Sequence, residues 1–339
     1  MTGIAHRSAR TNAETREAVK RFFRTGSIFI ALALLWTALA FASPYFFTQQ
    51  NILNILLQSS TVGILAAGVT LVLIAGEIDI SVASVQALAA TVSATVIITH
   101  DGSVALGIAA GILVAVVAGS LNGYATIYAR IPSFIVTLAM LGIAQGAAFL
   151  VTGGQAIGEF PHSYGVLGQG KVGPVPVPVI IAGAVYLVLH LLLSQTPFGL
   201  NVYAVGGSRN ASRLAGLRIE RTIMTVFVIS GALSGLAGII LSARLDAAHG
   251  SFGASDLLDA VAAVVIGGTS LFGGAGGVIG TLGGVVIIST IRNGLVLLNV
   301  EAFWTQVVVG GVILVAVLLD QMFKGELAPR DLVPGLRRA

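Results

Sequence analysis

The sequence predicts an all-α integral membrane protein with about ten transmembrane helices, some of them broken or re-entrant, and with both termini in the cytoplasm. Of its 339 residues, 56% are hydrophobic and only 9% are charged, and the mean hydropathy is +0.96. A soluble domain carries about 25% charged residues. A chain this poor in charge has the lipid bilayer as its natural solvent.

Ten apolar segments are long enough to be considered as membrane spans, since a span needs about 20 mostly apolar residues. They cover residues 27–47, 55–75, 81–99, 104–127, 133–151, 177–194, 222–243, 258–273, 277–298 and 303–320. Glycine interrupts the region 258–298, so these two segments could fold as broken or re-entrant elements. The first segment is a retained helix rather than a signal peptide, because it is as long as a span and lacks a small-residue cleavage site.

The Lys and Arg residues predict the orientation. With ten spans and a cytoplasmic N-terminus, 15 of the 18 basic residues lie inside, as the positive-inside rule requires. The chain then divides into a cytoplasmic tail (1–26), a permease domain (27–320) with a cytoplasmic loop at about 195–221, and a second cytoplasmic tail (321–339). The net charge of +4 follows from this bias and does not indicate a nucleic-acid partner.

The composition argues against several kinds of chemistry. The absence of cysteine excludes disulfides, thiolate metal sites and Cys nucleophiles. The five histidines have no metal-ligand spacing. We find no paired catalytic carboxylates and no nucleophile elbow. The sequence therefore predicts no catalytic residues, no metal and no bound cofactor.

Two carboxylates, Glu77 and Asp79, stand between the second and third predicted spans and are followed by Ser81. Asp79 and Ser81 could cap the third helix. If the segment is a simple cytoplasmic turn, the acids are solvated. If it dips into the membrane, they line a polar cavity. The residues alone leave both alternatives open.

The long cytoplasmic loop contains the pattern of a short helix. It reads as a Gly-Gly turn, a Ser or Asn cap, one or two helical turns over about 210–217, and a Gly stop. The residues that carry the pattern are Gly206, Gly207, Ser208, Arg209, Asn210, Arg213, Leu214 and Gly216. Such a helix is either a connector or a docking element for a cytoplasmic partner.

A glycine-rich stretch at 266–280 contains Gly267, Gly268, Thr269 and Ser270. It is not a phosphate-binding loop, because no Lys-Ser or Lys-Thr follows the glycines. Irregular backbone at membrane depth, buried in protein or facing a cavity, is the better interpretation.

Arg292 and Asn293 lie within the ninth predicted span. Arg292 is about six residues, or roughly 9 Å, from the predicted outer end. Its side chain either snorkels to the headgroups or faces a translocation cavity, where guanidinium donors can bind hydroxyl groups.

Several phrases resemble those of the ABC transporter permeases of the ribose/xylose/arabinose (monosaccharide) importer family, and they occur in the family's order. Residues 76–85 are similar to the family's GGIDLSVGSV, residues 206–216 to GGNEEAARLSGI, and residues 259–271 to DAIAAVVIGGTSL. Residues 131–138 and 303–306 also resemble family phrases. The sequence departs from the pattern at Glu77, Ala83, Arg209, Ala211 and Arg292.

The resemblance implies the transmembrane permease subunit of a binding-protein-dependent importer in the bacterial inner membrane. It implies a homodimer, a periplasmic or lipid-anchored sugar-binding protein, and a separate cytoplasmic ATPase that uses the ATP. The loop residues from Gly206 to Gly216 would couple to that ATPase. We expect the following residues to lie near the pathway or a gate: Glu77, Asp79, Ser81, Gly267, Gly268, Thr269, Ser270, Arg292 and Asn293. The alternatives are a branched-chain amino acid or nucleoside permease of the same superfamily, or an ion-coupled secondary transporter.

Overall fold

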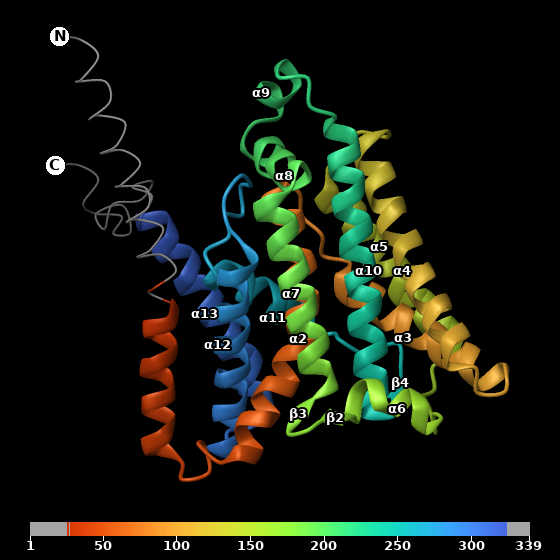
Figure 1. Cartoon of the computed structure of the whole chain (residues 1–339), viewed down its shortest axis with the longest axis vertical. Helices are drawn as coiled ribbons and strands as arrows, with labels where there is room; N and C mark the ends of the chain where they lie inside the picture. Colours follow the sequence, from red (N-terminus) through yellow and green to blue (C-terminus); the bar gives the residue numbers. More distant parts are fainter. Residues whose placement is uncertain (1–25, 27, 324–339) are drawn as a thin grey trace.

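The structure, a computed structural model, describes residue 26 and residues 28–323 and is almost entirely helical (Figure 1). Seven of the described helices are long and apolar enough to cross a membrane. They are α2 (Gln49–Ile74), α3 (Val82–Thr99), α4 (Val104–Ile127), α5 (Ser133–Thr152), α7 (Val177–Gln195), α10 (Ile219–Leu245) and α12 (Val278–Leu297). This confirms the predicted all-α, multi-pass membrane class. The two predicted tails lie almost wholly outside the described residues.

Two further apolar helical stretches are shorter than a full span. They are Ile28–Ala42 and Phe303–Val315, the latter within α13 (Ala302–Phe323). Each overlaps a predicted span, at 27–47 and 303–320. The count of ten spans and the cytoplasmic termini stay predictions.

Short elements gather at the two ends of the helical bundle. α8 (Pro197–Gly207) and α9 (Arg209–Leu214) lie at one end, at the top of Figure 1. At the opposite end lie α6 (His162–Gln169) and two small antiparallel ladders. The ladders pair β1 (Ile157–Gly158) with β4 (Ala247–Ala248), and β2 (Lys171–Val172) with β3 (Val175–Pro176).

The predicted segment 258–273 is broken, which confirms the alternative of a broken element in this glycine-rich region. The helix there, α11 (Asp256–Ile266), has 11 residues, and an irregular segment at 267–277 follows it. Gly268, Gly273, Gly274 and Gly276 in this segment all have positive φ values. Glycine adopts such backbone conformations without a steric penalty, so the sequence breaks the helix where the glycines begin.

Glycine also allows α10 to pack closely at the centre of the bundle. A Cβ atom on Gly231 of α10 would lie 2.4 Å from the carbonyl oxygen of Ala115 in α4. A Cβ on Gly119 of α4 would lie 2.3 Å from the carbonyl oxygen of Phe227. Small residues permit such backbone contact in lipid, where no hydrophobic force drives helices together.

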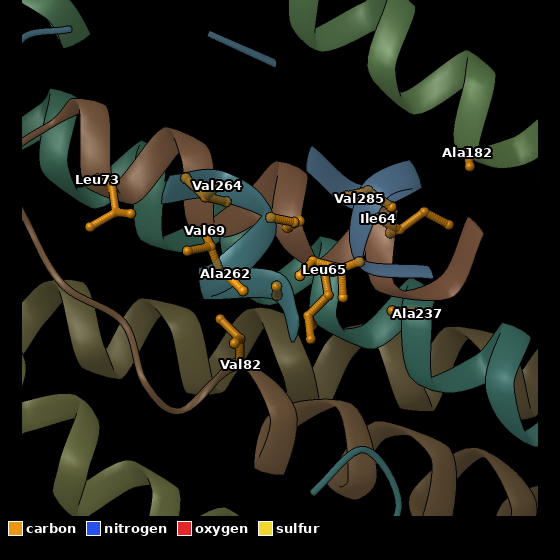
Figure 2. Close-up of a cluster of buried hydrophobic side chains, with 14 of the residues drawn as sticks. Ile64, Leu65, Val69, Leu73, Val82, Ala182, Ala237, Ala262, Val264 and Val285 are labelled. Carbon is orange, nitrogen blue, oxygen red and sulfur yellow. The ribbon is translucent and has the colours of Figure 1, made fainter. Parts of the chain in front are cut away.

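An apolar core joins α2 to the C-terminal helices. Ile64, Leu65 and Val69 of α2 pack with Val264 of α11 and Val285 of α12 (Figure 2). This core fixes the positions of α2, α11 and α12 relative to one another, and these helices line the cavity described next.

Candidate functional site

Helices α2, α10, α11 and α12 line a cavity of about 320 Å³. This volume is at the lower end of the range for small-molecule sites, about 300–1,000 Å³. The polar lining residues are Asn54, Gln58, Thr61, Arg244, Asp256, Asp259, Ser289 and Arg292, and the apolar ones are Leu57, Val62 and Leu241. The cavity therefore combines hydrogen-bonding groups with an apolar wall.

An ion pair between two helices lies in this lining. The Nε atom of Arg292 in α12 is 2.8 Å from Oδ2 of Asp259 in α11. Asp259 is 1% exposed, and neither of its carboxylate oxygens has a hydrogen bond of good geometry to any described residue. The contact thus joins α11 to α12 through a buried ion pair.

The other two charged lining residues bind protein groups. Arg244 donates to the carbonyl oxygen of Leu57 at 3.3 Å, and Asp256 accepts from Nε2 of Gln86 at 3.0 Å. With two Arg and two Asp residues ionised, the charges in the lining sum to zero. Such a lining does not select a ligand by net charge.

Arg292 lines this cavity and is paired with Asp259. Its two interpretations, snorkelling to the headgroups or facing the translocation cavity of a dimer, stay predictions. Its neighbour Asn293 has a different environment. The side-chain amides of Asn293 and Asn51 donate to each other, at 2.7 and 3.0 Å, and Asn51 also donates to the carbonyl oxygen of Phe46. Asn293 therefore joins α12 to α2 and does not line this cavity.

The sequence interpretation did not single out most of the cavity. Among the polar lining residues, only Arg292 was a candidate site residue from the sequence. One usable signal was present, because Asp256 and Asp259 are three residues apart and share a helical face. The contributions of α2 arise from tertiary packing, which no local pattern reveals.

A solvated turn at residues 75–81 is wrong, because Glu77 and Asp79 are only 4% and 5% exposed. Oδ1 of Asp79 accepts hydrogen bonds from the backbone N–H and the hydroxyl of Ser81, at 2.9 and 2.6 Å. Oδ2 accepts from Ser230 of α10 at 3.2 Å, and Asn122 of α4 donates to Ser81 at 2.9 Å. Ser81 occupies the N-cap position of α3 without a capping side-chain bond. The loop is thus a buried hydrogen-bonded connection, and it does not line the cavity.

Glu77 connects this loop to α9 through an ion pair with Arg209. Burial raises the pKa of the Glu77 carboxyl above its ordinary value, and the charge of Arg209 opposes that rise. The next residue, Ile78, donates its N–H to Ser133 of α5 at 3.1 Å. The loop therefore contacts α9 on one side and the bundle on the other.

The capped short helix in the loop that was predicted to be cytoplasmic is confirmed, with two corrections. Ser208 accepts from the N–H of Ala211 at 3.2 Å, and Gly216 follows the helix with φ of +76°. The helix covers Arg209–Leu214 rather than 210–217. Gly206 and Gly207 form the last turn of α8 rather than a turn between elements.

The glycines at the end of α8 lie where three backbone segments approach one another closely. These segments are the loop 75–77, the end of α8 and the loop 267–277. The N–H of Gly274 donates to the carbonyl oxygen of Ile74 at 2.9 Å. A Cβ atom on Gly206 would lie 1.8 Å from that same oxygen. No side chain fits there, so glycine is required for the close approach.

The glycine-rich residues Gly267 to Ser270 do not line the cavity. Thr269 accepts from the N–H of Gly277 at 3.4 Å, and the N–H of Ser270 donates to the carbonyl oxygen of Ala275 at 3.0 Å. These hydrogen bonds stabilise the irregular loop. They also pair backbone groups that would be energetically unfavourable in lipid without a hydrogen-bond partner.

Comparison with known proteins assigns the chain to a family. The family described as "Branched-chain amino acid transport system / permease component" matches residues 51–318. The chain belongs to this permease family. The comparison with solved structures gave no significant match.

Individual relatives of the permease confirm the resemblance found in its sequence phrases. Ribose import permease protein RbsC of Bacillus subtilis is 40% identical over 295 residues, 86% of this chain and 91% of the relative. RbsC of Escherichia coli K12 is 39% identical, covering 86% and 92%. L-arabinose ABC transporter permease protein AraH of Azospirillum brasilense is 37% identical over 309 residues, 91% of each chain. The permease thus has a transport role rather than a catalytic one.

Proposed function

We propose that this permease is the transmembrane subunit of a binding-protein-dependent ABC importer that moves a monosaccharide of the pentose or hexose type into the cell. The observation that carries the proposal is its 36–40% identity to ribose and arabinose permeases over at least 86% of the chain. The family description names branched-chain amino acids, but these individual relatives are named for sugars.

The proposal includes the other subunits. A separate cytoplasmic ATPase uses the ATP and contacts α9, while this chain binds no nucleotide or other cofactor. A periplasmic or lipid-anchored protein delivers the sugar at the opposite end of the bundle. Two copies of the permease, with about ten spans each and cytoplasmic termini, form the pore in the bacterial inner membrane.

Exposure supports the role proposed for α9. Leu214 at its end is 91% exposed, and the exposed side chains of Arg209, Asn210 and Arg213 surround it on the same short helix. An exposed apolar residue on a capped helix with basic neighbours suits docking into a groove of a partner. The loop with Glu77, Asp79 and Ser81 then lies between α9 and the bundle. In this position it can act as a gate that is controlled by the ATPase through α9.

Reconstitution tests the function. Vesicles that contain the permease, its ATPase and its binding protein should accumulate D-ribose or L-arabinose. This accumulation should require ATP on the side of the membrane where the ATPase lies. L-leucine and a nucleoside serve as alternative substrates. Uptake of leucine alone would favour the amino-acid alternative, and uptake abolished by collapse of the proton gradient would favour a secondary transporter.

A further inference from the structure

We infer that the N-terminal half of α2 lies in the interface between two copies of the permease. The contact is made by three side-chain amides, those of Gln50, Asn54 and Gln58, which follow one another at every fourth position. Residues four apart share one face of a helix, so the amides form a polar stripe along α2. The inference rests on the proposed function, which includes two copies, and adds to it the surface through which they meet.

The polar stripe is open to the outside of the bundle. Gln50 and Gln58 are exposed, and Asn54 is half-buried. The amide of Gln50 donates to Oδ1 of Asn54 over a long distance of 3.4 Å. The side chain of Gln58 makes no hydrogen bond to any residue that the structure describes. These amides therefore have donors and acceptors that the described part of the chain does not satisfy.

Lipid is an unfavourable neighbour for Gln58, because this residue lies at membrane depth. The helix α2 has 26 residues and is therefore about 39 Å long. A hydrocarbon layer of about 30 Å centred on it leaves about 5 Å of the helix outside at each end. Gln58 is about 13 Å from the start of α2 at Gln49, so it lies within that layer. An amide without a hydrogen-bond partner is costly there.

The other spans show what a lipid-facing surface of this protein looks like. In the middle of their spans, α4 exposes Leu113, α5 exposes Ile143 and α7 exposes Leu187, each of them 60–63% exposed. These side chains are apolar, as contact with hydrocarbon favours. The amide stripe on α2 differs from this surface, and contact with another protein chain explains the difference.

The place of the stripe beside the cavity also argues against lipid. Asn54 and Gln58 line the cavity together with Arg244 and Arg292. Because Gln58 is also exposed, the cavity reaches the surface of the bundle at the stripe. Charged residues at membrane depth face the protein interior or water. A second copy that covers the stripe would separate this side of the cavity from lipid.

The chemistry of the stripe is complementary to itself. Each amide side chain has two N–H donors and a carbonyl acceptor, so an identical stripe offers the partners that these residues lack. Amide side chains hydrogen-bond across helix interfaces in membranes. In a two-fold dimer both copies use the same surface patch. The stripe thus fits a second copy of this chain without any other component.

Cysteine cross-linking tests the interface, because the chain has no cysteine of its own. Gln50→Cys, Asn54→Cys and Gln58→Cys each place one thiol on α2, at points about 6 Å apart along the helix. Near a two-fold axis a thiol meets the same thiol of the second copy, and a disulfide forms when the two Cα atoms are about 4.4–6.8 Å apart. At least one variant should give a disulfide-linked dimer in membranes treated with copper phenanthroline. The controls Leu113→Cys and Leu187→Cys, at exposed positions of α4 and α7, should not.

A second measurement is the dissociation constant of the dimer in detergent. Gln58→Leu is compatible with lipid but cannot hydrogen-bond. The dissociation constant should therefore rise roughly threefold to tenfold, the factor for one lost hydrogen bond between helices. Gln195→Leu makes the same change at an exposed position at the end of α7 and should leave the constant unchanged. Equal constants for Gln58→Leu and wild type would contradict the contact.

Two cross-linking results would overturn the inference. One is a wild-type dimer in which none of the three α2 thiols cross-links. The other is reaction of these thiols with a membrane-impermeant maleimide in the assembled dimer, without cross-linking, since the stripe would then face water. Neither result depends on transport. Absence of sugar uptake in a complex whose α2 thiols do cross-link would instead overturn the proposed function and leave the interface intact.

Discussion

Arg209 and Glu77 form an ion pair between a half-exposed side chain and a buried one, and this pair joins α9 to the loop between α2 and α3. Arg209 is 49% exposed and Glu77 is 4% exposed. From Glu77 the connection continues through the backbone to Asp79, which binds Ser81 and Ser230 inside the bundle. The ion pair, the intervening backbone and these hydrogen bonds thus connect α9 with the start of α3 and with α10.

Loss of Arg209 should destabilise the permease, because it leaves the buried Glu77 carboxylate without its partner. We expect Arg209→Gln to lower the free energy of unfolding by about 1–3 kcal/mol, less than for a fully buried pair because Arg209 is half exposed. Thermal unfolding in detergent measures this. Arg213→Gln is the matched control, since Arg213 is an exposed arginine of the same helix. The double variant Glu77→Gln/Arg209→Gln should recover part of the loss, and equal unfolding temperatures for Arg209→Gln and Arg213→Gln would contradict the assignment.

Leu214 should matter for coupling and not for folding. With 91% of the side chain exposed, Leu214→Asp should leave membrane insertion and stability unchanged. If Leu214 docks into the ATPase, this charge should uncouple ATP hydrolysis from sugar uptake. Leu214→Met keeps an apolar side chain and should behave as wild type. Wild-type levels of transport-coupled ATPase activity in Leu214→Asp would exclude the docking role.

Asp79 should contribute to transport more than to assembly. Asp79→Asn keeps one oxygen acceptor but replaces the other with a donor, so it cannot accept from both Ser81 and Ser230. We expect lower sugar uptake at unchanged membrane abundance. Asp101→Asn is the control, since Asp101 is exposed in the turn after α3. Unchanged sugar uptake in Asp79→Asn would contradict a role of Asp79 in transport and would leave the loop with a structural role only.

Arg292 can be tested by two substitutions compared at equal membrane abundance. Arg292→Leu leaves Asp259 buried without its ion-pair partner, so it should impair both stability and uptake. Arg292→Lys keeps the charge but loses the planar fork of donors. Loss of uptake in both variants indicates that the fork is required, and loss in Leu alone indicates that the charge suffices. Normal transport in both variants would remove Arg292 from the pathway.

The sequence predicted the elements whose determinants are local. Apolar length predicted the seven long helices, and Ser208 with Gly216 predicted the limits of α9 to within a few residues. The helix α8 was missed although Thr196 and Pro197 are a typical helix start, and Thr196 indeed accepts from the N–H of Gly199 at 3.2 Å.

The cavity depended on contacts that no local pattern contains. Asp259 and Arg292 are 33 positions apart in the chain, and they meet only because the break after Ile266 returns the chain into α12 beside α11. Glu77 likewise meets a residue distant in sequence, because its ion-pair partner Arg209 lies 132 positions later in the chain. Residue types identified these positions as polar at membrane depth, but tertiary packing decides what each one contacts.

ATP-dependent uptake of labelled D-ribose and L-arabinose by vesicles that contain the permease, its ATPase and its binding protein tests the central claim most directly. The account predicts that at least one sugar accumulates, that accumulation requires ATP, and that it persists when the proton gradient is collapsed. Accumulation of leucine but neither sugar, or sugar uptake that requires the proton gradient and not ATP, would contradict it.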